Sequence, residues 1–153
     1  MAYNNHLHNL DQTLVQVAKL LNSKKIPWLL GASGALYVHG LAITPQDLDF
    51  FTSAQNVQDL EKDFQPYLTN PLHYFDQVNQ KEIEFQAKIN DIDIEVCELD
   101  ISSGELVKID FHGVPIPVSP LAEYLKIYSD NPKHADRVAL IRDSLKKDSE
   151  THT

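Results

Sequence analysis

The sequence predicts an α/β (α+β) fold, in which helices pack on a mixed β-sheet and a short helical extension follows at the C-terminus. Apolar residues recur at helical spacing over residues 10–21, and a short apolar run at residues 28–30 ends in a turn of small residues. Apolar and polar residues then alternate on both sides of Asn90-Asp91, as in a β-hairpin. A helix pattern, a buried strand and a hairpin within 153 residues are typical of a domain that mixes helices with a sheet.

The composition indicates which broad classes of protein are compatible with this sequence. With 42% hydrophobic and 23% charged residues, the chain has the balance of an ordinary globular protein. No apolar stretch approaches the roughly 20 residues of a membrane span, and the N-terminus lacks a signal-peptide pattern. The single cysteine, Cys97, cannot form an internal disulfide, so we expect a reducing, cytoplasmic location. A net charge of −9 argues against a broad DNA- or RNA-binding surface, because such surfaces are rich in cations.

The first half of the chain predicts two strands set between helices. Asn9, with Gln12 three residues later, has the pattern of a helix N-cap. Leu48 and Phe50 alternate with polar residues, so the strand that carries them has one apolar and one mainly acidic face. In chain order, the predicted segments are a loose terminus at residues 1–8, a helix from residue 9 to the polar residues 22–25, a buried strand at 28–30, a short helix at 35–39, a strand at 47–51 and a helix that follows Ser53.

The second half predicts mainly strands, followed by two helices. A hairpin turn at residues 90–91 pairs Lys88 with Asp93 and Gln86 with Glu95 across the two strands. In chain order, the predicted segments are a loop at residues 66–71, a short strand at 73–75, the hairpin strands at 83–89 and 92–97, a strand at 106–111, an edge strand at 114–118 with two prolines, helices that start at residues 119 and 131, and a disordered tail after residue 146.

Two aspartates, Asp47 and Asp49, lie two residues apart on a predicted strand, so both carboxylates project from the same face. Convergent carboxylates on a rigid element are ligands that Mg²⁺ prefers, particularly where nucleotide phosphates complete its coordination. Taken alone, the pair is a weak motif, and a solvated strand that follows a loop is the favoured interpretation. A second motif is therefore needed to favour a metal site.

The small residues at 31–34 separate the buried strand from the short helix and supply such a motif. Backbone N–H groups at the start of a helix, together with the Ser33 hydroxyl, can hold a phosphate group. A tight turn that needs small side chains for packing predicts the same residue types. The GxGxxG and GxxxxGK[ST] patterns are absent, so the sequence supports neither a Rossmann nor a P-loop site.

Together the two motifs resemble those of DNA polymerase beta-like nucleotidyltransferases. The resemblance lies in Trp28-Leu-Leu-Gly-Ala-Ser-Gly-Ala-Leu-Tyr-Val-His-Gly40, followed by Pro45-Gln-Asp-Leu-Asp-Phe50. Family members have a hydrophobic strand, Gly-Ser or Gly-Gly, a short helix that ends in His-Gly, and then Pro-x-Asp-hydrophobic-Asp. The resemblance implies a mixed sheet of the nucleotidyltransferase type. It also implies an enzyme that moves a nucleoside monophosphate from an NTP to an acceptor hydroxyl and releases pyrophosphate.

The family has a third acidic residue on a later strand, and Asp93 and Glu95 both lie on the polar face of the predicted hairpin. Asp93 has Lys88 opposite it, whereas Glu95 has no such partner and falls where short family members have hydrophobic-Glu-hydrophobic. We therefore expect Glu95 and keep Asp93 as the alternative. The resemblance implies that Asp47, Asp49 and Glu95 hold two Mg²⁺ ions, that ATP is the expected NTP, and that Glu95 is a candidate general base.

The same resemblance assigns Gly31, Ala32 and Ser33 to the nucleotide phosphates, with Lys126 facing them from a later helix. Alignment on His39-Gly40 places Ser33 on the family serine, but Ala32 stands where the family usually has glycine. Either Gly31 is the displaced glycine, or the phosphate cradle is slightly altered.

The resemblance divides the chain into a nucleotidyltransferase core at residues 1–118 and a C-terminal helical extension and tail at residues 119–153, in one compact unit. The leading prediction is an enzyme that acts on a nucleotide and an acceptor, which is a small molecule, an RNA end or a protein side chain. The alternative is a catalytically weakened member that binds nucleotide or a protein partner, such as the antitoxin half of a two-protein module. Ala32 and the lack of an acceptor-binding domain favour this alternative, whereas three acidic candidates in the right order favour the enzyme.

Overall fold

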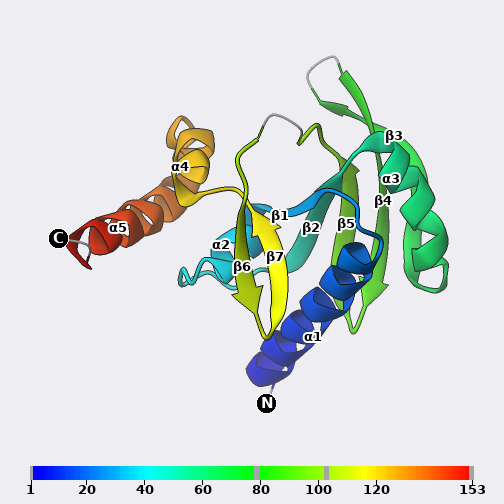
Figure 1. Cartoon of the computed structure of the whole chain (residues 1–153), viewed down its shortest axis with the longest axis horizontal. Coiled ribbons are helices and arrows are strands. Elements are labelled where there is room, and N and C mark those ends of the chain that lie inside the picture. Colours follow the sequence, from blue (N-terminus) through cyan, green and yellow to red (C-terminus); the bar gives the residue numbers. More distant parts are fainter. Residues whose placement is uncertain (1, 78–79, 102–103, 152–153) are drawn as a thin grey trace.

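A computed structural model describes residues 2–77, 80–101 and 104–151 of the chain (Figure 1). It contains a five-stranded sheet, a two-stranded sheet and helices at both ends of the chain. The elements are α1 (Ala2–Ser23), β1 (Trp28–Gly31), α2 (Ala32–Val38), β2 (Asp47–Thr52), α3 (Ala54–Leu60), the 3₁₀ helix η1 (Glu61–Tyr67), β3 (Leu68–Gln77), β4 (Gln80–Ile89), β5 (Ile92–Glu98), β6 (Val107–Phe111), β7 (Val114–Val118), α4 (Leu121–Ser129), η2 (Pro132–His134) and α5 (Ala135–Thr151).

The five-stranded sheet has the order β1-β2-β5-β4-β3. β2 and β5 run parallel, and the other neighbouring pairs are antiparallel. β6 and β7 form a separate antiparallel pair. This mixed sheet, with helices packed around it, confirms the α/β (α+β) class that the sequence predicts.

The apolar face of the sheet forms the core. Leu48 and Phe50 on β2 are buried, as are Ile94 and Val96 on the neighbouring β5. They belong to one cluster with the apolar stripe of α1 and with Val57 and the other buried residues of α3. Because side chains alternate along a strand, the odd-numbered residues of β2 and β5 lie on the opposite, polar face. The candidate site lies on that face.

The hairpin of β4 and β5 has the predicted turn and register. Asn90 and Asp91 have φ angles of +51° and +65°, the pattern of a two-residue type I′ turn. Lys88 lies opposite Asp93, and Gln86 lies opposite Glu95. Both predicted cross-strand pairs are confirmed.

Three predicted loops are regular structure instead. The N-terminal residues belong to α1, where the ring of His6 is hydrogen-bonded to the carbonyl of Pro45 at 2.8 Å. The predicted disordered tail continues α5 to Thr151, with an i,i+4 ion pair between Lys147 and Asp143. The predicted loop at residues 66–71 gives way to β3, which starts at Leu68 and pairs with β4 through two register shifts. An edge strand tolerates proline and irregular pairing, so these residues form a strand despite their turn-like composition.

The C-terminal helices lie beside β1, on the opposite side of the molecule from β3 (Figure 1). Tyr124 of α4 donates a hydrogen bond to the carbonyl of Leu30 at 3.5 Å, and the ring of His39 bonds the carbonyl of Ser119 at 2.9 Å. These contacts connect the extension to the strand and helix that precede β2. The division of the chain at residue 118 stays a prediction. Within the described ranges, none of the helices combines the length and apolar character that a bilayer crossing needs.

Candidate active site

Asp47 and Asp49 lie on the polar face of β2, as predicted. They alternate with the buried residues Leu48 and Phe50, which fix the orientation of the strand. Asp47 is exposed at the start of the strand, and Asp49 is half-buried one pleat further on. The burial of the apolar neighbours therefore directs both carboxylates to one side of the sheet.

β5 brings Glu95 beside this pair. In the parallel register, Asp49 lies opposite Glu95 and Asp47 lies opposite Asp93. The side chains of Asp49 and Glu95 share a hydrogen bond, and Gln86 donates a second one to Glu95 at 3.2 Å. Asp93 is instead exposed and pairs with Lys88 at 3.7 Å. Of the two candidates for a third carboxylate, Glu95 is the one that joins Asp49 in a hydrogen bond.

The carboxylates at this site resist full ionisation. Burial, the hydrogen bond with Glu95 and the charge of Asp47 raise the pKa of Asp49 to about 8. Burial, followed by the charges of Glu95 and Asp93, also raises the pKa of Asp47. Burial and the neighbouring Glu84 raise the pKa of Glu95. The three raised pKa values have the same causes, which are burial and neighbouring carboxylates with few cations near them. A bound cation would relieve this repulsion and favour the ionised carboxylates.

The donor set fits a hard divalent cation. The contributing side chains of Asp47, Asp49 and Glu95 are carboxylates on two hydrogen-bonded strands, and Mg²⁺ prefers oxygen ligands of this kind. A cavity of about 290 Å³ opens beside them. Its lining consists of Asp47, Thr69, Gln86, Ala87, Asp93, Ile94 and Glu95. Asp47 and Glu95 therefore belong both to the set of candidate metal ligands and to the lining of a cavity that could hold a second molecule.

The turn after β1 lies next to the carboxylates because Gly31 pairs with Asp49 across the sheet. Gly31 is extended (φ −119°), so it needs no unusual conformation. It lacks a side chain because a Cβ would lie 2.4 Å from Cε2 of Phe51. The left-handed conformation belongs to Ala32, whose φ is +52°. The position where the family usually has glycine therefore has the backbone that favours glycine, and Ala32 adopts it under strain.

Replacing Ala32 with glycine is expected to raise the free energy of unfolding by roughly 0.5–1 kcal/mol. Relief of about 1–2 kcal/mol of left-handed strain exceeds the loss of about 0.4–1 kcal/mol from a more flexible unfolded chain. Denaturant unfolding of Ala32→Gly measures the change. Ala35→Gly is the matched control on the same short helix, where the residue is buried and lacks a positive φ, and it should lower stability. Destabilisation by Ala32→Gly would contradict the strain.

The basic side chains of the C-terminal helices differ in their relation to the site. The Lys126 ammonium, predicted to face the nucleotide phosphates, is exposed and lies 3.3 Å from Glu123. Arg137 is the cation that opposes the rise in the pKa of Asp47. Its guanidinium lies over the ring of Tyr128 and donates to the Tyr128 hydroxyl at 3.2 Å. The sequence offered no signal for this arrangement, since Arg137 has the pattern of a solvated helix face.

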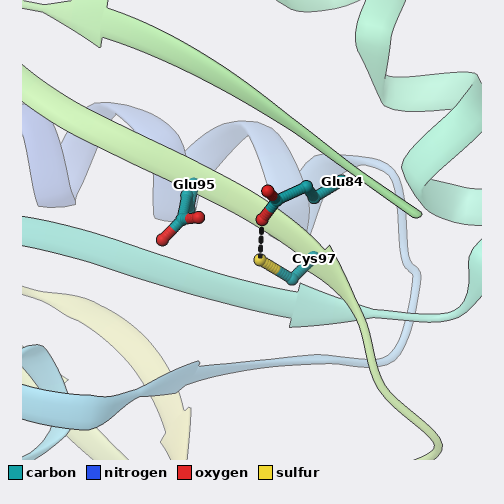
Figure 2. A group of neighbouring side chains, drawn as sticks. All are labelled: Glu84, Glu95 and Cys97. Atoms are coloured by element: carbon teal, nitrogen blue, oxygen red, sulfur yellow. Dashed lines mark hydrogen bonds between the residues drawn. The ribbon is translucent and has the colours of Figure 1, made fainter. Parts of the chain in front are cut away.

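Sequence reasoning also missed Glu84, which lies beside Glu95 on the polar face (Figure 2). Glu84 is 7% exposed and lies opposite Cys97 on β5. The hairpin register contained the signal, because the next pair on the same face beyond Gln86 and Glu95 places Glu84 against Cys97. Burial acts to raise the pKa of Glu84, but hydrogen bonds from Glu95, Cys97 and His73 outweigh it and lower that pKa.

Comparison with solved structures identifies the fold. TM1012 from Thermotoga maritima, provisionally assigned as a nucleotidyltransferase, superposes with a TM-score of 0.70 and 16% identity, over 89% of this chain and 92% of that one. An antigenic nucleotidyltransferase-like protein from Paracoccidioides brasiliensis gives a TM-score of 0.56 and 12% identity, over 88% and 75% of the two chains. ANT(2")-Ia, solved in complex with adenylyl-2"-tobramycin, gives 0.54 and 16%, over 87% and 88%.

Comparisons with protein-family models and with curated protein sequences find no match. At these identities, the structural likeness establishes the fold alone. The chain has the nucleotidyltransferase fold, which confirms the resemblance inferred from residues 28–50.

Proposed function

We propose that this chain is a Mg²⁺-dependent nucleotidyltransferase, which moves a nucleoside monophosphate from an NTP, expected to be ATP, to an acceptor hydroxyl. The observation that carries the proposal is the alignment of Asp49 with Glu95 on neighbouring parallel strands, with Asp47 on the same face, in a protein of the nucleotidyltransferase fold. One free cysteine and NTP as substrate both suit the cytoplasm, which is the compartment we propose.

The proposed roles follow from the chemistry of each side chain. Asp47, Asp49 and Glu95 would hold Mg²⁺, which when bound neutralises phosphate charge and lowers the pKa of a coordinated hydroxyl. Glu95, with its raised pKa, is suited to accept the proton of the acceptor hydroxyl. A new bond forms between the acceptor oxygen and the α-phosphorus as the bond to pyrophosphate breaks. Gly31, Ala32 and Ser33 would border the phosphates beside Asp49, and Lys126 would reach them only by leaving Glu123.

The cavity beside the carboxylates supports a small, amine-bearing acceptor. Asp47, Asp93 and Glu95 give its lining negative charge, and Thr69 and Gln86 add neutral polar groups. Such a lining attracts ammonium groups and repels a phosphodiester backbone. Among a small molecule, an RNA end and a protein side chain, we therefore favour a small molecule with both amino and hydroxyl groups.

Label transfer tests the proposal. The protein is incubated with α-labelled ATP, GTP, CTP or UTP, Mg²⁺, and in turn an aminoglycoside, a neutral sugar, a short RNA or no added acceptor. We expect label on the amine-bearing acceptor, none after Mg²⁺ is chelated, and a rise in melting temperature with Mg²⁺-NTP. Transfer that persists with excess chelator would contradict the metal dependence. Label on RNA alone would contradict the acceptor class.

A second candidate is a nucleotidyltransferase-fold module that binds nucleotide or a protein partner without turnover. The strained Ala32 beside the proposed phosphate site is the observation that favours it. Absence of transfer to every acceptor would favour this candidate. A melting shift with Mg²⁺-NTP would then indicate a nucleotide-binding module, and the absence of any shift would favour a protein-interaction module.

A further inference from the structure

An extra residue in the edge strand β3 brings Thr69 to the polar face of the sheet. Leu68 pairs with Ala87 of β4, and Asn70 pairs with the next residue, Gln86. Thr69 therefore has no opposite residue and forms a β-bulge, a feature that redirects side chains. Leu68 packs against the core, and in a regular strand Asn70 would share its face. The bulge instead lets Asn70 donate a hydrogen bond to Gln86 on the polar face, at 3.3 Å.

The side chain between Thr69 and the carboxylates has its orientation fixed. Gln86 accepts from Asn70 through Oε1 and donates through Nε2 to Glu95 at 3.2 Å. Thr69 is exposed and lines the same cavity of about 290 Å³ as Glu95. Within the described residues, no side chain or backbone group is hydrogen-bonded to its hydroxyl. A hydroxyl donates one hydrogen bond and accepts two, so Thr69 can bind a molecule in the cavity.

The strand order sets the distance between Thr69 and Glu95. β4 lies between β5, which carries Glu95, and β3, which carries Thr69 (Figure 1). Neighbouring strands are about 4.8 Å apart, so the two side chains lie roughly 10 Å apart across the polar face. A molecule that bridges them uses about 2.8 Å for each hydrogen bond, which leaves roughly 4–5 Å between its own two groups. One six-membered ring provides that span.

Charge is distributed unevenly along the cavity. Asp47, Asp93 and Glu95 make the part over β2 and β5 negative, whereas Gln86 and Thr69 make the part over β4 and β3 neutral. An ammonium group is attracted to the carboxylates. The part of the cavity beside Thr69 therefore suits an uncharged hydrogen-bonding group.

We propose that Thr69 determines which acceptors bind, by hydrogen-bonding an uncharged polar group that lies across one six-membered ring from the reacting hydroxyl. This inference rests on the proposed function, because it takes the cavity as the acceptor site. The amino group of the acceptor then lies near the reacting hydroxyl, at the carboxylate end. The preferred acceptor is a cyclic amino alcohol with a further hydroxyl on the far side of its ring.

Two small amines test the role of Thr69 in binding, without dependence on turnover. Glucosamine has an amino group beside a hydroxyl, with further hydroxyls across its ring, whereas trans-2-aminocyclohexanol keeps only the neighbouring amino and hydroxyl groups. Binding of each to the full chain is measured by isothermal titration calorimetry without NTP. Thr69→Val removes the hydroxyl and keeps the shape of the side chain. We expect it to weaken the binding of glucosamine by roughly 3–10-fold, the size of one hydrogen bond, and to leave aminocyclohexanol unaffected.

Thr69→Ser keeps a hydroxyl and is the matched control, which should bind glucosamine as the unmodified protein does. Equal losses for both amines in Thr69→Val, no loss for either, or the same loss in Thr69→Ser would overturn the inference. Failure of the unmodified protein to prefer glucosamine would also overturn it. Label transfer that does not depend on Thr69 would leave the proposed function standing without this inference. Selective binding of glucosamine without transfer would contradict the enzyme but keep the Thr69 site.

Discussion

Asp49→Asn is expected to stabilise the metal-free protein above neutral pH and to lower nucleotidyl transfer by roughly 10³-fold. The stabilisation follows from the half-buried carboxylate, whose pKa burial, the hydrogen bond with Glu95 and the charge of Asp47 raise to about 8. Asparagine keeps the shape of the protonated carboxyl and can donate the same hydrogen bond to Glu95, without the charge. The lost rate reflects several kcal/mol of metal-assisted stabilisation, with about 1.4 kcal/mol for each factor of ten.

The sign of the pH dependence follows from the two pKa values. The ordinary pKa of an aspartate is 3.8 and that of Asp49 in the folded protein is about 8, so the folded state binds more protons between these values. The free energy of unfolding of the metal-free wild type should therefore fall as pH rises from about 4 to 8. The Asp49 contribution has a slope of at most about 1.4 kcal/mol per pH unit. Asp49→Asn should flatten the curve, because its side chain cannot ionise.

Denaturant unfolding at a series of pH values, with and without Mg²⁺, measures both parts of this prediction. At pH 8 Mg²⁺ should stabilise the wild type more than Asp49→Asn, because the variant lacks one proposed ligand. Asp59→Asn, an exposed carboxylate on α3, is the matched control and should leave both the pH profile and the Mg²⁺ response unchanged. A wild-type stability that rises between pH 5 and 8 would contradict the charge concentration assigned to Asp49.

Much of the fold could be predicted because local patterns agree with the final packing. Alternation about Leu48 and Phe50 predicted the orientation of Asp47 and Asp49, and the turn at residues 90–91 predicted the register that places Gln86 opposite Glu95. Those local patterns could not predict that β2 pairs with β5. Parallel strands are joined by long crossovers, and nothing local specifies which residues of two distant segments align. The register of Asp49 with Glu95 therefore emerges only from the structure.

Two other features, the contact of His73 with Glu84 and the backbone conformation of Ala32, could not be predicted from the sequence, for physical reasons. Pro71 and its polar neighbours have turn-like composition, but β3 is an edge strand and pairs irregularly with β4, so His73 reaches Glu84 from a segment expected to be mostly loop. Ala32 was recognised as a departure from the family pattern, yet the sequence could not say which residue carries the unusual backbone. The structure assigns it to Ala32, because Gly31 is extended and instead gives room to Phe51.

Glu95→Gln should lose most of the nucleotidyl transfer, whereas Asp93→Asn should retain it. Comparison of the two rates decides which residue is the third carboxylate. Glu95 is hydrogen-bonded to Asp49 and Gln86, whereas Asp93 is exposed and paired with Lys88. If Glu95 holds the cation and accepts the hydroxyl proton, Glu95→Gln should lower transfer by about 10²–10⁴-fold. Asp93→Asn removes an exposed ion pair worth at most about 1 kcal/mol of stability. It also weakens the negative lining of the proposed acceptor cavity, so at a saturating concentration of acceptor it should leave most of the transfer intact.

The two variants are measured by single-turnover label transfer at saturating Mg²⁺-NTP, so that chemistry is separated from binding. In Glu95→Gln the new amide oxygen can still accept the hydrogen bond from Gln86, so the strand pairing survives and a loss of rate reports the missing carboxylate rather than a disrupted sheet. The reverse result, loss in Asp93→Asn with retention in Glu95→Gln, would make Asp93 the third carboxylate. The active pair would then be Asp47 with Asp93, which are also aligned across β2 and β5.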